Sequence, residues 1–135
     1  SALLVKAGDE SLATLDIGCI DLYTGKAEFL KAGGACSFLC RGGRTIQIKG
    51  PSLPAGILQG IQYDRHKAQL REGDLLVMVT DGAIAISEDW LAEEIAALDG
   101  QEPEFIADKL TQLAALRQQG RGDDITVAAV RLELS

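Results

Sequence analysis

Residues 75–79 read LLVMV, an unbroken apolar run that stands between Gly73-Asp74 and Thr80-Asp81-Gly82. Short apolar runs with β-branched residues, bounded by turn signals, are typical of strands that are buried on both faces of a sheet. Such a strand is central, so the rest of the chain must fold around it. At its end the Asp81 carboxylate is held rigidly, and Gly82 permits a sharp turn that points this carboxylate out of the sheet edge.

The position of Asp81 admits two interpretations. A rigid carboxylate at the edge of a sheet is well placed to be a metal ligand or an acid/base group. Asp-Gly is also among the commonest turn signals. Thr80-Asp81-Gly82 would then be an ordinary turn in which Asp81 caps the helix predicted to begin near Ser87, or bonds its own backbone. These residues alone do not separate the two.

Composition narrows the class of protein. A chain of 135 residues is sized for one domain, and 47% hydrophobic with 24% charged residues describes an ordinary soluble protein. The net charge of -7 and the lack of a Lys/Arg cluster argue against a nucleic-acid partner. No apolar run approaches the roughly 20 residues of a membrane span, and no signal-peptide pattern is present. We therefore expect a soluble, cytoplasmic segment.

The cysteines predict neither a disulfide framework nor a metal site. Cys19, Cys36 and Cys40 are odd in number and lie in strand-like apolar patterns, so we expect free, buried thiols. Cys36 and Cys40 are four residues apart, but the chain has one histidine, His66, which disfavours a zinc site. His66 is expected to be a solvent-facing strand residue.

The first half of the chain reads as strands and turns. Residues 1–10 resemble the end of an apolar helix, and residues 51–56 predict an ordered loop because their prolines remove ladder donors. The expected strands are residues 12–22, 27–32, 37–41, 45–49 and 62–70. Turns at Tyr23-Thr24-Gly25-Lys26 and Gly42-Gly43 make two successive hairpins, which predict an antiparallel meander.

The second half changes to a helical period. A helix is predicted from Ser87 to the stop at Asp99-Gly100, and another from the Glu102-Pro103-Glu104 start. The residues expected on their inner faces are Trp90, Leu91, Ile95 and Leu98, then Phe105, Ile106, Leu110, Leu113 and Leu116. Asp123-Asp124 opens a final strand over residues 125–134. The pattern is that of a single α+β domain without internal linkers.

The two strand-end aspartates are the candidate site. Asp81 leaves one strand and Asp123 enters another, so adjacent antiparallel strands would bring both to one sheet edge. Two carboxylates there suit Mg²⁺ or Mn²⁺ much better than Zn²⁺. A glycosidase-like acid pair is disfavoured, because that chemistry needs a sugar-stacking cleft and aromatic residues make up only 4% of the chain.

Several motifs of the chain resemble those of a known protein family. Thr80-Asp81-Gly82 after an apolar strand, followed by Gly122-Asp123-Asp124-Ile125-Thr126-Val127, resembles the C-terminal half of metal-dependent (PPM, PP2C-like) protein serine/threonine phosphatases. Other stretches resemble the stage II sporulation protein E type of catalytic domain: Thr14-Leu15-Asp16-Ile17, Ile20-Asp21-Leu22-Tyr23-Thr24-Gly25, Lys31-Ala32-Gly33, Ser37-Phe38-Leu39 and Ser52-Leu53-Pro54-Ala55-Gly56-Ile57-Leu58.

The resemblance implies a fold, a reaction and a set of roles. It implies a PP2C-like α-β-β-α sandwich, with helices outside antiparallel sheets, of which residues 1–135 are the C-terminal part. It implies hydrolysis of phosphoserine on an anti-anti-sigma factor at a centre of two Mn²⁺ or Mg²⁺ ions, in a parent protein that is membrane-anchored upstream. By position, Asp81 and Asp123 match metal ligands of the family. Asp124 matches a residue that hydrogen-bonds to the metal site without being a ligand. Gly82 matches the turn glycine, and Thr80 stands beside the first ligand.

One family motif is missing. The Asp-Gly-Met-Gly type of segment, whose aspartate bridges both metals, occurs nowhere in these 135 residues, since Asp9, Asp16 and Asp21 lack the glycine-rich context. We therefore expect a sandwich that lacks its N-terminal strands and helices, a partial metal site, little activity in isolation, and homodimerisation or other self-association through exposed apolar surface. Two alternatives stay open: a non-catalytic regulatory or interaction module with the same fold, and an unrelated α+β domain with two turn aspartates.

Overall fold

The computed structural model describes residues 2–8, 15–32, 36–48, 53–58, 61–79, 88–117 and 126–134. One sheet has the strand order β1-β2-β3-β7-β6, with β1 at Ala2–Gly8, β2 at Leu15–Asp21, β3 at Lys26–Ala32, β7 at Ile61–Gln69 and β6 at Leu53–Leu58. The other has the order β5-β4-β8-β9, with β5 at Arg44–Gln47, β4 at Cys36–Arg41, β8 at Leu75–Val79 and β9 at Val127–Arg131. The helices are α1 at Glu88–Leu98 and α2 at Pro103–Arg117.

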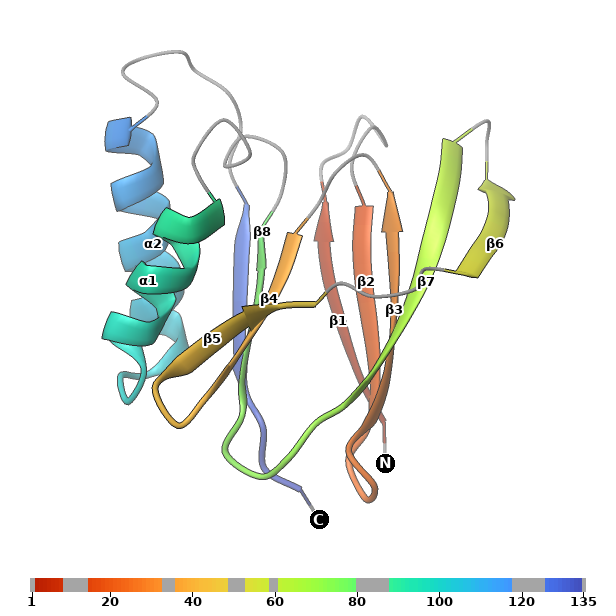
Figure 1. Cartoon of the computed structure of the whole chain (residues 1–135), viewed down its shortest axis with the longest axis horizontal. Coiled ribbons are helices and arrows are strands. Elements are labelled where there is room, and N and C mark those ends of the chain that lie inside the picture. The colour runs from red at the N-terminus through yellow and green to blue at the C-terminus, as the bar shows by residue number, and fades with distance from the viewer. Residues whose placement is uncertain are drawn as a thin grey trace.

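The two sheets stack face to face, and α1 and α2 cover the outer face of the four-stranded sheet (Figure 1). All paired strands are antiparallel. An inter-sheet cluster of buried residues comprises Ile20, Ala27, Phe29, Leu39, Ile48, Leu70, Leu76, Met78 and Leu132. A helix-side cluster comprises Phe38, Cys40, Leu75, Val77, Val79, Leu91, Ile95, Ile106, Leu110 and Ala114. The α+β fold class predicted from the sequence is confirmed.

Both predicted glycine turns are present. Gly25 has φ of 77°, and a Cβ there would lie 2.2 Å from the Leu70 carbonyl oxygen, so only glycine fits. Gly42 and Gly43 have φ of 58° and 76°, the two positive values that a type I′ turn requires. Each turn joins the hairpin strands expected around it.

The predicted meander is wrong. β2 and β3 belong to the five-stranded sheet, whereas β4 and β5 belong to the four-stranded sheet. Local signals define each hairpin, but they do not say which strand the next hairpin pairs with. β4 pairs instead with β8, from Cys36↔Val79 to Cys40↔Leu75. The chain therefore changes sheets between the two hairpins.

Two segments predicted to be irregular or helical are strands. Residues 2–8 form β1, which pairs with β2 from Ala2↔Asp21 to Gly8↔Leu15, because a short apolar run is compatible with either helix or strand until a partner is available. Residues 53–58 form β6, an edge strand with a register shift between Pro54 and Gly56. Edge strands with bulges tolerate a proline that a central strand would exclude.

Four side-chain predictions need correction. Cys19 is exposed rather than buried, since it lies on the outward side of β2, whereas Cys40 is buried as expected. His66 was expected to face solvent, but it is half-buried on the inward side of β7 and its Nδ1 has no hydrogen-bond partner. Phe105 and Leu116 were expected in the core and are 51% and 75% exposed, because α2 packs through Ile106, Leu110 and Ala114.

Candidate functional site

The central strand β8 is the rigid element of the site. All five of its residues are buried. Leu75, Val77 and Val79 belong to the helix-side cluster, while Leu76 and Met78 belong to the inter-sheet cluster. β4 pairs with one edge of β8 and β9 with the other. Because neighbours pack on both faces and both edges, the end of β8 at Val79 is held firmly, as the sequence predicted.

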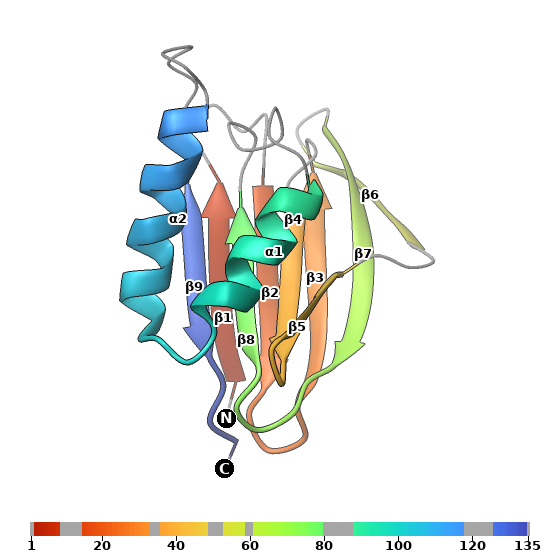
Figure 2. The same cartoon turned by 60° about the vertical axis from the view of Figure 1, so that its left-hand side comes forward.

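β8 and β9 are adjacent and antiparallel, the arrangement that the candidate site requires. Their register runs from Leu75↔Arg131 to Val79↔Val127. The end of β8 therefore lies beside the start of β9, at the upper end of the sheet in Figure 2. Thr80, Asp81 and Gly82 directly follow β8, and Asp123 and Asp124 precede Thr126, the residue before β9; all five lie outside the described residues.

The opposite end of β8 is fixed by an ion pair between a buried carboxylate and a partly exposed arginine, which the sequence did not predict. Asp74 is 1% exposed and accepts hydrogen bonds from Arg41 Nε at 2.8 Å, from Arg41 Nη2 at 2.6 Å and from the Arg71 backbone N–H at 2.7 Å. The hydrogen bond to Asp74 raises the pKa of Arg41. Gly73-Asp74 indicated a turn in the sequence, but no sequence pattern indicated that Asp74 pairs with Arg41, 33 residues away.

A second ion pair joins the turn between the helices to β9. Arg131 Nη1 donates to Asp99 Oδ1 at 2.7 Å, and Arg131 Nη2 donates to the Gln101 carbonyl at 3.2 Å. Asp99 Oδ2 accepts from the Gly43 backbone N–H at 3.2 Å. The hydrogen bond from Arg131 holds the pKa of Asp99 below its usual value. The helix pair and the β4–β5 turn are thus attached to the end of β9 that lies away from the candidate site.

The pairing of β8 with β9 continues past the strand ends. The Gly73 N–H donates to the Leu132 carbonyl, and the Leu132 N–H donates to the Asp74 carbonyl, both at 2.9 Å. Arg131 Nη1 also lies 3.3 Å from the Gly73 carbonyl. These bonds extend the ladder beyond Leu75↔Arg131, so the register at this end is fixed by backbone and side chains together. A fixed register here determines which residues meet at the other end.

In the ranges that the structure describes, no group of three or more His, Cys, Asp or Glu residues is placed to hold a metal ion. Burial raises the pKa of Cys40, which favours its neutral thiol form. Neither described helix is long and apolar enough to cross a membrane.

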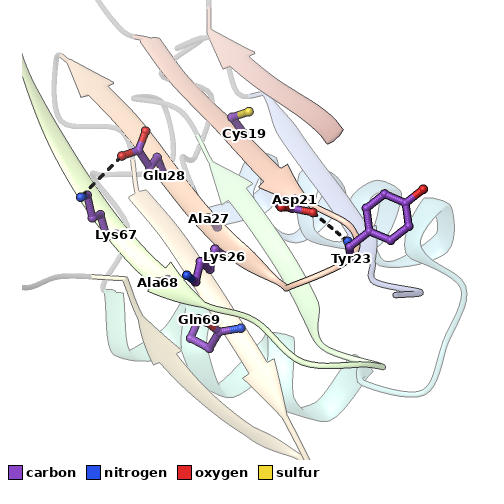
Figure 3. Close-up of a pocket in the computed structure, with 9 residues that line it drawn as sticks. All are labelled: Cys19, Asp21, Tyr23, Lys26, Ala27, Glu28, Lys67, Ala68 and Gln69. Atoms are coloured by element: carbon purple, nitrogen blue, oxygen red, sulfur yellow. Dashed lines mark hydrogen bonds and ion pairs between the residues drawn. The ribbon is translucent and has the colours of Figure 1, made fainter. Parts of the chain in front are cut away.

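A groove lies on the other sheet. It has a volume of about 910 Å³ and lies on the five-stranded sheet near the β2–β3 turn (Figure 3), lined by Cys19, Asp21, Tyr23, Lys26, Ala27, Glu28, Lys67, Ala68 and Gln69. An ion pair across the groove, between Lys67 Nζ and Glu28 Oε1 at 3.8 Å, joins two exposed side chains. Gln69 pairs with Lys26, and β8 starts soon after Gln69, so the groove lies at the far end from where β8 finishes. The groove and the candidate site are separate.

Comparison with solved structures gives the class of protein. The phosphatase domain of the cell fate determinant SpoIIE from Bacillus subtilis matches with a TM-score of 0.78 and 32% identity, over 97% of this chain and 60% of that one. A Mn-presoaked form of that domain matches with a TM-score of 0.76 and 31% identity, over 96% of this chain and 60% of that one. PppA of Pseudomonas aeruginosa shares the fold with a TM-score of 0.65 and 20% identity, over 89% of this chain and 58% of that one. The fold is that of PP2C phosphatase domains.

The family follows from the sequence comparisons. The family model for Stage II sporulation protein E (SpoIIE) matches residues 1–133, and this chain belongs to that family. Stage II sporulation protein E of Priestia megaterium is 33% identical over 140 residues, covering 98% of this chain and 24% of the relative. The Bacillus subtilis protein is 32% identical over 140 residues, covering 98% of this chain and 17% of the relative. The chain thus spans a quarter or less of these relatives, and three-fifths of the solved domain.

Proposed function

We propose that residues 1–135 form the C-terminal part of one structural domain, and that the complete domain is a metal-dependent protein serine phosphatase. Family membership and the match to 60% of a solved phosphatase domain support this proposal. The proposed substrate is a phosphoserine-bearing anti-anti-sigma factor, which rests on the sporulation resemblance. The partner that completes the domain is the N-terminal half of the same phosphatase fold.

One observation of the structure carries the proposal: the register pair Val79↔Val127. Asp81 follows Val79 by two residues, and Asp123 precedes Val127 by four. An extended chain spans at most about 3.6 Å per residue, so Asp81 lies within about 7 Å of the end of β8 and Asp123 within about 14 Å of the start of β9, measured between Cα atoms. These bounds support the proposal that both carboxylates lie at the same end of this strand pair.

The donor types fit Mn²⁺ or Mg²⁺, two ions in the complete domain, because aspartate oxygens are the ligands that hard divalent cations prefer. In the proposal Asp81 and Asp123 hold one of these ions, while Asp124 orients the site by a hydrogen bond. Gly82 allows the turn that aims Asp81, and Thr80 links this turn to β8. When bound, the ions would neutralise charge on the phosphoryl group and make water more acidic. The chain's contribution is a rigid strand pair that holds two acids at a set spacing.

The test is manganese-dependent phosphate release from a phosphoserine-bearing anti-anti-sigma factor by the complete domain. We expect Asp81→Asn to lower kcat/KM by about 100-fold or more, because loss of a ligand removes several kcal/mol of charge stabilisation. Asp108→Asn, the same change at an exposed position of α2, is the matched control and should keep wild-type activity. Circular dichroism establishes that both variants are folded.

Two results would contradict this function. Wild-type activity in Asp81→Asn would show that this residue is not a ligand. A complete domain that binds Mn²⁺ but releases no phosphate from any phosphoserine protein would instead favour the non-catalytic interaction module.

A further inference from the structure

Two of the large apolar side chains that are exposed in the described part of the chain lie on α2. Phe105 is 51% exposed and Leu116 is 75% exposed. At about 100° per residue, the separation of these two residues amounts to three helical turns and about 20° more. Both side chains therefore lie on the same side of α2, about 16 Å apart along its axis.

These two residues are the ends of one exposed stripe. Lys109 and Gln112 lie between them at spacings of four, three and four residues, and both are exposed. Such a spacing is the one by which two helices pack along a common seam. We call Phe105, Lys109, Gln112 and Leu116 the outer stripe. The buried face of α2 is separate from it and consists of Ile106, Leu110 and Ala114.

The outer stripe belongs to the outermost layer of the molecule. α1 and α2 cover the outer face of the four-stranded sheet, so the fold has its helices on the outside (Figure 1). The exposed side of α2 therefore faces solvent and not a further layer of the sandwich. Single exposed apolar residues need no explanation, but two that share a stripe on an outer helix form an anchor pair of the kind used in helix recognition.

The charge around the outer stripe indicates the kind of partner. The exposed carboxylates of the helix pair and its turn are Asp89, Glu93, Glu102, Glu104 and Asp108. None of the five takes part in the ion pairs found in the described part of the chain. Lys109 is on the stripe itself, whereas the Arg117 guanidinium carbon lies 4.2 Å from the centroid of the Trp90 ring. The carboxylates therefore outnumber the cations, and the surface is complementary to a basic partner.

The same charges disfavour a second copy of the chain on this face. Two copies that met through α2 would bring the carboxylates of one helix layer against those of the other, and the chain has a net charge of -7. Like charges placed together oppose association. A separate protein with the opposite charge is therefore the occupant that the surface favours.

We propose that the outer stripe is a docking site for another protein, which presents an amphipathic helix with apolar residues along one side and lysines or arginines beside them. The apolar residues of that helix pack against Phe105, Leu116 and the methylene stem of Lys109. Its cations face Glu104 and Asp108. This inference goes beyond the proposed function and does not depend on it.

The experiment is a fluorescence anisotropy titration of a labelled helical peptide with the complete phosphatase domain. The peptide carries leucines at spacings of four, three and four residues, with lysines beside them. A control peptide of identical composition has its leucines distributed around the helix. We expect the first peptide to bind at least about tenfold more tightly than the control, because only the first presents an apolar face. Added NaCl should weaken its binding, since exposed charges are screened.

Variants of the domain place the binding on α2. Leu116→Ser should raise the Kd of the first peptide by about tenfold and Phe105→Ser by about fivefold, because each removes an apolar anchor. Ile46→Ser is the matched control, since Ile46 is 57% exposed on β5, and it should leave the Kd unchanged.

A charge-reversal pair tests the acidic surround in the same way. Asp108→Lys should raise the Kd by about threefold at low salt. Glu28→Lys, at an exposed position of β3, should not change it. Circular dichroism establishes that the variants are folded.

Equal binding of the two peptides, a wild-type Kd in Leu116→Ser, or an equal rise in Ile46→Ser would overturn the docking site. Sedimentation equilibrium of the domain without peptide tests the other occupant. A dimer that becomes monomeric in Leu116→Ser would show that the outer stripe binds a second copy, which would also overturn the proposal. A monomeric wild-type domain that binds the first peptide through Phe105 and Leu116 is the result that we expect.

Discussion

At the scale of single residues, two Asp–Arg pairs fix the end of the sheet that lies away from the candidate site. Asp74 is buried beneath Arg41 and accepts three hydrogen bonds, whereas Asp99 and Arg131 remain 20% and 26% exposed. The Asp99–Arg131 pair has a pH signature, because the hydrogen bond from Arg131 lowers the pKa of Asp99. A carboxylate with a lowered pKa in the folded state stabilises the fold only while it is ionised.

Asp99→Asn should therefore lower stability in a pH-dependent way. We expect a loss of about 1 kcal/mol in the free energy of unfolding at pH 7, as for a partly exposed ion pair. This loss should persist down to the unfolded pKa of 3.8 and disappear as the pH falls further, through the lowered folded pKa. Urea titrations of wild type and variant at pH 7, 5, 4 and 3 measure it. A difference that stays constant down to pH 3 would contradict the assignment.

At the scale of elements, α2 shows how packing selects among apolar positions. The hydrophobic pattern predicted an inner face made of Phe105, Ile106, Leu110, Leu113 and Leu116. The helix packs over β9 and beside α1, and only Ile106, Leu110 and Ala114 are fully buried, at a spacing of four residues. Phe105 and Leu116 lie outside that stripe and are exposed. The hydrophobic pattern identified the helix, whereas the neighbouring elements decided which face is buried.

Ile106→Ala and Phe105→Ala form a pair of neighbouring truncations with opposite expectations. Ile106 is 0% exposed, so its truncation should cost about 2–5 kcal/mol through lost burial and a cavity. Phe105 is 51% exposed, and its truncation should cost about 0.5 kcal/mol or less. Urea unfolding followed by circular dichroism measures both. Equal losses in the two variants would mean that α2 is rotated relative to the structure described here.

At the scale of the whole molecule, local sequence signals predicted many of the elements, but not how the strands are arranged into two sheets. The buried strand 75–79, both glycine turns and both helices were predicted, because each has its signal within a few residues. β1 and β6 were missed because pairing with the strand that follows, β2 or β7, makes each a strand, and their own residue patterns do not indicate this pairing. The placement of two hairpins in different sheets was missed because it depends on partners far along the chain: β3 pairs with β7, and β4 pairs with β8.

The candidate site, too, could be predicted only in part from the sequence. Asp81 and Asp123 could be named from their motifs, but the adjacency of β8 and β9 came only from the structure. The Asp74–Arg41 and Trp90–Arg117 contacts join residues far apart in sequence, so no local pattern indicated them. Self-association of this chain stays a prediction. In the described ranges, helices cover the four-stranded sheet alone (Figure 1). The five-stranded sheet carries exposed charged side chains such as Glu28 and Lys67 (Figure 3).

The central claim is that Asp81 and Asp123 bind the same cation across the β8–β9 pair. Electron paramagnetic resonance titration of free Mn²⁺ with the complete domain tests it, using wild type, Asp81→Asn, Asp123→Asn and the double variant. We predict that each single change weakens Mn²⁺ binding by about tenfold or more, and that the double change weakens it by less than the product, because groups in one site are coupled. Wild-type Mn²⁺ affinity in either single variant would contradict the claim.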